Sequence, residues 1–338
     1  MTHHLRNFFG TLALGLAALF VGPAHASPYS AMYVFGDSLS DTGNLSLATG
    51  GAQPPAGQPY FNGRFSDGLV WVDHLAAGLG LSAGAVPSLA GGNNYAFAGA
   101  RTGAVGSPPG VLAQVAGMWA PTHAVADPTA LYVVVGGGND MRDARSAFTS
   151  NSVADQAGRQ AAADAAVFNL FQSLAVLAGN GARHVLMANL PDLGLTPEAA
   201  FLGVQSASSD ASARFNAALL AMELVAEASF GLQIDMLDFA GIGLAVRNDA
   251  LNNGGAVYGI TNATSPCAGF AFSSGASCSV SLFSDALHPS ARMHAIAGAA
   301  ALQLVPEPAS AWLVLVAVGG LVVQRRRAAL TPSRAWQP

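Results

Sequence analysis

Four short apolar runs along the chain each end abruptly at polar or turn-forming residues. The runs occupy residues 31–35, 131–135, 184–188 and 232–237. They are rich in β-branched and aromatic residues and continuous rather than alternating, which is typical of strands buried on both faces. The pattern therefore predicts parallel strands in the interior of a sheet.

Apolar residues at helical spacing occupy the stretches between these runs. We expect helices over residues 69–79, 153–178, 206–230 and 292–304. Strands that alternate with helices favour an α/β fold, in which ligands bind beyond the carboxyl ends of the strands. Two long segments rich in Gly, Ser and Pro, 49–59 and 252–281, are expected to be loops that contact substrate or decorate the surface.

The amino-terminal end has the pattern of a secretory signal. Arg6 precedes an apolar stretch at 8–21, and Ala24-His25-Ala26 matches a small-x-small cleavage site. We therefore expect residues 1–26 to be a signal peptide. A retained membrane anchor is the alternative, although the apolar stretch is short for a spanning helix.

The carboxyl-terminal end carries a second apolar segment, 309–323, between Pro306-Glu307-Pro308 and the arginines 325–327. A short hydrophobic span followed by positive charge is typical of a membrane helix with a cytoplasmic stop. This order of parts resembles the PEP-CTERM sorting tail of Gram-negative bacteria. The resemblance implies that 305–338 anchors the protein transiently, engages export and sorting machinery, and is cleaved at the cell surface. A plain membrane anchor is the alternative.

The composition is consistent with one large exported domain at 27–304. Hydrophobic residues make up 51% of the chain and charged residues 10%, which excludes a disordered chain. The basic residues are 14 Arg and no Lys, against 19 acidic residues, for a net charge of -5. This balance indicates no nucleic-acid partner.

Cys267 and Cys278 are the two cysteines of the chain. Their even number, an oxidising compartment and the Gly/Ser-rich segment between them favour a disulfide. A metal site is the alternative, but no further cysteine or close histidine completes a tetrahedral set. No other residues have the spacing of metal ligands, so we expect no metal. No motif implies a cofactor, so we expect none.

Two segments offer a nucleophile and a base. Ser38 follows the first predicted strand, at the edge where its hydroxyl would be exposed. Asp285 precedes His288 by three residues in a turn held by Pro289, so its carboxylate could orient one ring nitrogen while the other takes the serine proton. Each signal alone is weak, because a serine at a strand end is more often a helix cap and Asp–His neighbours are common.

Two glycine-containing segments offer hydrogen-bond donors. Gly99 could present a bare backbone N–H, and Asn139 follows three glycines at the end of the second predicted strand. A phosphate loop is the rival interpretation of those glycines, but the Lys and Ser/Thr of such a loop are missing. Neighbouring polar side chains are expected to brace these turns: Asp41, Asn44 and Asp140.

Taken together, these blocks resemble the GDSL family, also called SGNH hydrolases after one Ser, Gly, Asn and His in separate blocks. The chain has Ser38 in GDSL, Gly99 in NYAFAGA, Asn139 in GGND, and His288 with Asp285 in DALHP, in that order. The resemblance extends from residue 32 to about 300. It implies a flavodoxin-like three-layer α/β/α sandwich with a central five-stranded parallel sheet. The G-x-S-x-G elbow of ordinary α/β-hydrolases is absent.

The resemblance also implies roles for these residues. Ser38 would be the nucleophile, His288 the general base and then acid, and Asp285 the residue that orients His288. The backbone N–H groups of Ser38 and Gly99, with the Asn139 side chain, would form the oxyanion hole. The implied function is that of an exported esterase or lipase that forms an acyl-enzyme on Ser38, acting on extracellular lipids or acylated polysaccharides. Acyl transfer to an alcohol is one alternative, and a catalytically silent surface-binding module is another.

Overall fold

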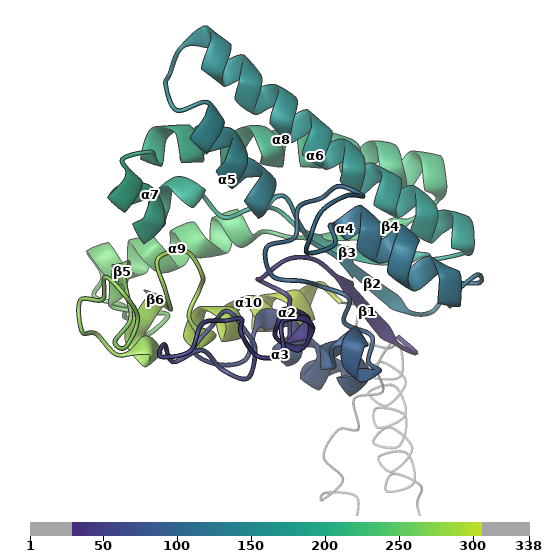
Figure 1. The fold of residues 1–338 in the computed structure, drawn as a ribbon, viewed down its shortest axis with the longest axis horizontal. Helices are drawn as coiled ribbons and strands as arrows, with labels where there is room; N and C mark the ends of the chain where they lie inside the picture. The colour runs from purple at the N-terminus through teal and green to yellow at the C-terminus, as the bar shows by residue number, and fades with distance from the viewer. Residues whose placement is uncertain (1–28, 306–338) are drawn as a thin grey trace, which may run out of the picture. The chain divides into compact units, whose positions relative to one another are not determined.

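The computed structural model describes residues 29–305. Within this range, a parallel sheet of four strands lies in the middle of the domain (Figure 1). The strands follow the order β1-β2-β3-β4 and comprise β1 (Met32–Phe35), β2 (Leu131–Val134), β3 (His184–Ala188) and β4 (Gln233–Leu237). The predicted runs therefore form the strands, with their ends shifted by at most one residue. The expected signal peptide and, apart from Val305, the expected sorting tail lie outside the described residues.

The sheet has four strands where five were expected, and an irregular segment takes the fifth place. This segment, 93–97, runs along the free side of β1. Tyr95 N donates to Val34 O at 2.7 Å, and Phe97 N donates to Gly36 O at 3.1 Å. Only a single bridge forms between this segment and β1, from Val34 to Asn94, and the chain turns soon afterwards at Gly99, whose φ is 82°. The spatial order is nevertheless the flavodoxin-like one, 2-1-3-4-5, if the segment is counted as the second strand.

Helices cover both faces of the sheet (Figure 1), which confirms the three-layer α/β/α arrangement. Alternate residues of each strand point to opposite faces. Tyr132 and Val134 pack with α6 and α8, whereas Leu131 and Val133 pack with α3 and α10. The helices are α2 (Asn44–Ala48), α3 (Trp71–Leu79), α4 (Val111–Ala113), α5 (Gly138–Ala147), α6 (Val153–Asn180), α7 (Pro197–Leu202), α8 (Gln205–Phe230), α9 (Phe239–Asn252) and α10 (Ala291–Leu304).

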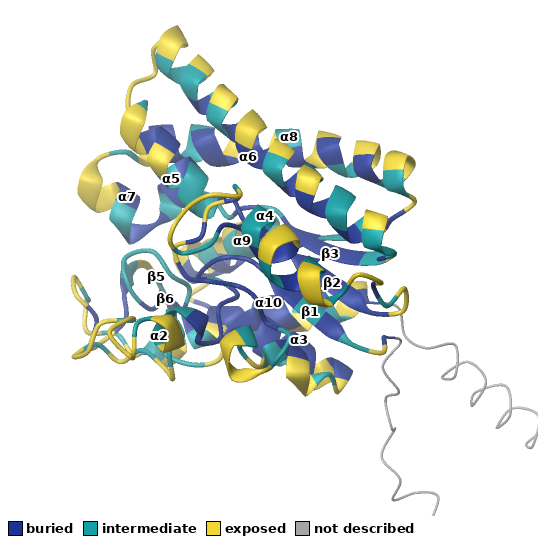
Figure 2. Ribbon diagram, turned by 45° about the vertical axis from the view of Figure 1, so that its right-hand side comes forward, coloured by how far each residue is buried: buried dark blue, intermediate teal, exposed yellow. Residues whose placement is uncertain are grey.

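The two longest helices, α6 and α8, each have buried residues along the side that packs in the core and exposed residues on the opposite side (Figure 2). In residues 29–305, α6 alone is long and apolar enough to cross a membrane by length and composition. Its residues Leu170, Leu174 and Leu177 belong to the same core as the sheet. Its apolar character is therefore accounted for by packing within the domain.

Part of the loop expected at 252–281 contains regular structure. The strand β5 (Asn262–Pro266) pairs in parallel with β6 (Ser281–Phe283), and a disulfide between Cys267 and Cys278 closes the loop between them. The predicted disulfide is thus present. The two sulfur atoms lie near the Asp67 carboxylate, but sulfurs joined in a disulfide are not the thiolates that a metal site needs. The end of β6 leads directly into the segment that carries Asp285 and His288.

Candidate active site

Ser38 lies in a tight turn directly after β1, at the carboxyl edge of the sheet. Asp37 O accepts hydrogen bonds from Ser40 N at 3.0 Å and Asp41 N at 2.9 Å, and Asp37 Oδ1 accepts one from Leu39 N at 3.0 Å. The next helix begins only at Asn44 and has Gly43 as its N-cap, so Ser38 caps no helix. This turn holds Ser38 at the end of β1, with 8% of its surface exposed.

His288 connects Ser38 to Asp285. Its Nε2 lies 2.9 Å from Ser38 Oγ, and its Nδ1 lies 2.7 Å from Asp285 Oδ2. The other carboxylate oxygen, Oδ1, accepts from Leu287 N at 2.8 Å and His288 N at 2.6 Å. Because an ionised carboxylate can only accept, Nδ1 carries the ring proton and Nε2 is free to accept from the Ser38 hydroxyl.

Several donors keep Asp285 ionised. Burial alone would raise the pKa of Asp285, but the charge and hydrogen bond of His288, the His288 backbone N–H and the Tyr60 hydroxyl together hold it well below its ordinary value. Tyr60 OH donates to Asp285 Oδ2 at 2.7 Å, while burial and the neighbouring carboxylate raise the pKa of Tyr60. Sequence reasoning missed Tyr60, because nothing local relates it to a carboxylate 225 residues later.

Asp41 and Asn44 connect the Ser38 turn by hydrogen bonds to the segment before Gly99, as expected. Asp41 Oδ2 accepts from Ala98 N at 2.8 Å, and Asp41 Oδ1 accepts from Asn44 N at 2.6 Å. Asn44 Nδ2 in turn donates to Ala96 O at 2.9 Å. Among the described residues, no acceptor is bonded to the backbone N–H of Ser38 or of Gly99. Both groups are thus available to a ligand.

Asn139 lies in the first turn of α5, after β2. Its Nδ2 donates to Ala100 O at 2.9 Å and retains a second hydrogen, while its Oδ1 accepts from Arg142 Nη1 at 3.3 Å. Asn139 lines one cavity together with Ser38 and His288, whereas Gly99 is not among the residues that line it. Asp140, expected to brace this region, accepts from the Thr102 hydroxyl at 2.9 Å and backbone N–H at 3.0 Å.

A partly buried ion-pair network that the sequence analysis did not identify supports Asn139. Glu198 at the start of α7 binds Arg142 through Nη2 at 2.5 Å and Nε at 3.1 Å, and also binds Arg145, which is almost fully buried. Burial would raise the pKa of Glu198, but both arginines lower it overall. Glu198 N also donates to Ala286 O at 2.7 Å. Glu198 therefore joins the helix that bears Asn139 to the segment that bears His288.

Asp37, next to Ser38, is a buried carboxyl group on the cavity wall. Burial raises the pKa of Asp37 to about 6, against the Leu39 N–H and the charge of His288, which lower it, and with Asp140, which raises it further. The structure therefore places a group that titrates in the mildly acidic range beside Ser38.

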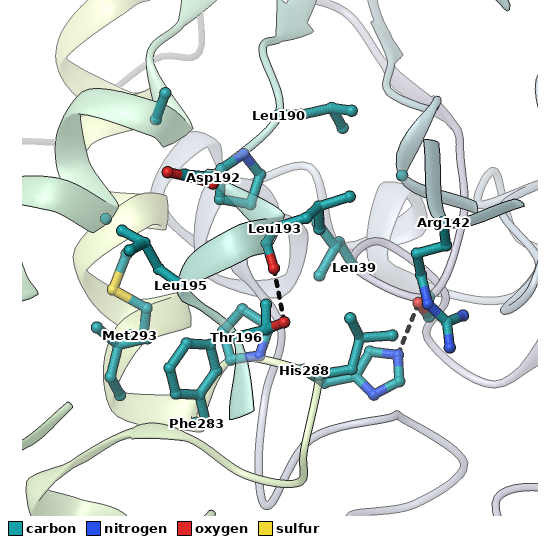
Figure 3. Close-up of a pocket in the computed structure, with 18 of the residues that line it drawn as sticks. Leu39, Arg142, Leu190, Asp192, Leu193, Leu195, Thr196, Phe283, His288 and Met293 are labelled. Atoms are coloured by element: carbon teal, nitrogen blue, oxygen red, sulfur yellow. Dashed lines mark hydrogen bonds between the residues drawn. The ribbon is translucent and has the colours of Figure 1, made fainter. Parts of the chain in front are cut away.

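The cavity next to Ser38 is mostly apolar (Figure 3). It contains about 850 Å³ of space, open to solvent on one side. Ser38, Asn139 and His288 lie on its wall, and leucines, Phe283 and Met293 form much of the rest. Its leucines are Leu39, Leu190, Leu193, Leu195, Leu244, Leu282 and Leu287. An apolar cavity with a few convergent polar groups is the usual form of a small-molecule site.

Comparison with known proteins gives several relatives of similar sequence. Over 225 residues the chain is 32% identical to the phosphatidylcholine-sterol acyltransferase of Aeromonas hydrophila, with 61% of this chain and 58% of the relative covered. It is 32% identical to esterase EstA of Pseudomonas aeruginosa over 243 residues, with 61% and 35% covered. The chain thus spans about a third to three fifths of the length of these relatives.

Among solved structures, the carbohydrate acetylesterase Est24 of Sinorhizobium meliloti aligns with a TM-score of 0.43 and 14% identity, covering 81% of this chain and 96% of that one. The family described as GDSL-like Lipase/Acylhydrolase matches residues 32–301, nearly all of the described domain. The protein belongs to the GDSL-like lipase/acylhydrolase family.

Proposed function

We propose that this protein is a serine hydrolase that cleaves carboxylic esters through an acyl-enzyme on Ser38. One observation carries the proposal: a continuous chain of hydrogen bonds runs from Ser38 Oγ through His288 to Asp285, at the wall of an apolar cavity. A nucleophile, a base and a group that orients the base are the parts that acyl transfer requires.

The first half of the reaction transfers the acyl group to the enzyme. His288 Nε2 takes the Ser38 proton as Oγ attacks the ester carbonyl carbon, and the carbonyl oxygen becomes an oxyanion. The free N–H groups of Ser38 and Gly99 and the second amide hydrogen of Asn139 stabilise that charge. The carbon–oxygen bond to the alcohol then breaks, and the alcohol leaves with the proton from His288.

The second half releases the acid. A water molecule gives its proton to His288 and attacks the acyl carbon, and the new tetrahedral species collapses to the free acid. The bond to Ser38 Oγ breaks and Oγ recovers the proton from His288. Asp285 remains ionised throughout and stabilises the imidazolium in both halves. An alcohol in place of water would make the same acyl-enzyme an acyltransferase.

A fluorophosphonate probe tests the proposal. Native protein should react covalently and hydrolyse p-nitrophenyl esters, whereas folded Ser38→Ala should do neither. Circular dichroism of both proteins shows whether they are equally folded. Folded native protein that neither reacts nor hydrolyses any of a panel of esters would contradict the proposal and favour a silent binding module.

We further propose that the protein is exported, with residues 1–26 removed as a signal peptide and 305–338 acting as a sorting tail. The disulfide between Cys267 and Cys278 supports an oxidising location. Extracellular lipids or acylated polysaccharides would then be the accessible ester substrates. Mass spectrometry of the protein recovered from the medium should give an amino terminus at Ser27, and an intact terminus at Met1 would contradict this part of the proposal.

A further inference from the structure

The apolar cavity beside Ser38 adjoins an open groove that carries several polar side chains. Leu195, Thr196 and Arg247 line both the cavity and this groove, which contains about 790 Å³ of space open to solvent. The groove is formed by the start of α7, the start of α8, α9 and β5. Its polar lining comprises Thr196, Gln205, Ser206, Ser209, Arg247 and Thr264. A ligand held at Ser38 can therefore reach from an almost wholly apolar cavity to a groove with more polar side chains.

Arg247 is the cationic side chain at the junction of these two spaces. Its Nη1 donates to Ala263 O at 2.9 Å, and its Nε and Nη2 have no acceptor within residues 29–305. The other arginines of the site region, Arg142 and Arg145, are paired with Glu198. No carboxylate of the described domain lies within 4.0 Å of the Arg247 guanidinium. Arg247 thus keeps donors and charge available for a ligand.

The acidic residues on the cavity wall, Asp37 and Asp192, form no ion pair with Arg247. Asp192 uses Oδ1 to accept from Gly194 N at 2.8 Å and from the Ser209 hydroxyl at 2.7 Å. Asp37 accepts from Leu39 N, and its pKa of about 6 leaves it partly protonated in mildly acidic medium. Because a guanidinium presents a planar fork of N–H donors, a partly buried one without a carboxylate is suited to bind the oxygens of a phosphate or sulfate.

We propose, building on the esterase function above, that Arg247 binds an anionic group carried on the alcohol side of the ester. The apolar cavity then holds the acyl chain, and the hydroxyl and amide side chains of the groove hold a polar, hydroxylated alcohol part. The substrate is therefore an amphiphilic ester with an apolar acyl chain and an anionic alcohol portion. A glycerophospholipid and an acylated sugar phosphate both have this chemistry.

Steady-state kinetics on two pairs of short-chain soluble esters test the proposal and separate the two sources. One pair is dihexanoyl phosphatidylglycerol and dihexanoylglycerol, and the other is hexanoyl glucose 6-phosphate and hexanoyl glucose. Arg247→Gln should lower kcat/KM about tenfold on the anionic member of the preferred pair, mainly through KM, which corresponds to about 1.4 kcal/mol. The neutral members should change less than about twofold, and Arg247→Lys should recover part of the loss because it keeps the charge.

Arg292→Gln is the matched control. Arg292 also donates to a backbone carbonyl, that of Tyr258, and has no carboxylate partner in the described domain, but it lines neither the cavity nor the groove. It should leave all four substrates unchanged. Equal loss on anionic and neutral esters in Arg247→Gln, or no loss on either, would overturn the assignment of Arg247 while leaving the esterase proposal intact. Failure of folded native protein to cleave any of the four would instead count against the esterase itself.

Discussion

Asp37→Asn should change how the stability of the protein depends on pH. Asp37 is buried next to the nucleophile, and burial raises its pKa from 3.8 to about 6. The unfolded chain loses this proton near the ordinary value, whereas the folded protein keeps it until about pH 6. The stability contributed by this group is therefore greatest below the unfolded pKa and is lost as pH rises through the folded pKa.

The size of the effect follows from the two pKa values. A difference of about two pH units corresponds to about 3 kcal/mol between the protonated and ionised forms. Asparagine cannot ionise and retains an oxygen that can accept the Leu39 N–H bond at 3.0 Å. Relative to native protein, Asp37→Asn should therefore gain up to about 3 kcal/mol in unfolding free energy between about pH 4 and about pH 7.

Urea denaturation of both proteins across that pH range measures the difference. The dependence of the unfolding free energy on urea should be the same for both, which shows that the same unit unfolds in each. A stability difference that stays constant from about pH 4 to about pH 7 would refute the reasoning, because it would mean that Asp37 titrates alike in the folded and unfolded chains.

Three further substitutions test the site and its support. Asn139→Ala should lower kcat by about 10²–10³ with the acylation of Ser38 still detectable, and native-like turnover would remove Asn139 from the oxyanion hole. Tyr60→Phe should lower the unfolding free energy by about 1.5–3 kcal/mol through its lost bond to Asp285, against no comparable loss in Tyr258→Phe, whose hydroxyl has no partner in the described domain. Gly137→Ala should cost about 1–3 kcal/mol in thermal or urea denaturation, because φ is 110° and a Cβ would overlap the Phe215 ring; unchanged stability would contradict this packing argument.

The regular elements could be predicted where the local pattern was strong. The apolar runs became strands, and the predicted helix at 206–230 corresponds to α8, which begins one residue earlier at Gln205. Five helices of the described domain were missed: the short α2, α4 and α7, and the longer α5 and α9. Of the two longer ones, α5 begins with Gly138 and Asn139, residues that favour turns, and a tertiary hydrogen bond from Asn139 to Ala100 O helps to fix its start. The other, α9, packs through Phe239 and Val246 into two separate cores, and it is shorter than α6 and α8.

The site shows the same division between local and distant information. The Ser38, Gly99, Asn139 and His288 blocks could be identified because together, and in that order, they resemble the motifs of the GDSL family, although each block alone is a weak signal. The network through Glu198 was not readable, because its partners come from α5, α7 and the Asp285–His288 segment.

By itself, the amino-acid sequence determined the layered α/β architecture and the cysteine pairing, because periodicity and cysteine number act over short stretches of chain. Its motifs also carried the family resemblance that implied which residues surround Ser38. Only the tertiary structure decided that an irregular segment replaces a fifth strand, that Tyr60 contacts Asp285, and that Arg247 has no carboxylate partner in residues 29–305. Those features depend on contacts between residues that are distant in the sequence and come together only in the folded chain. A local sequence pattern does not determine such contacts.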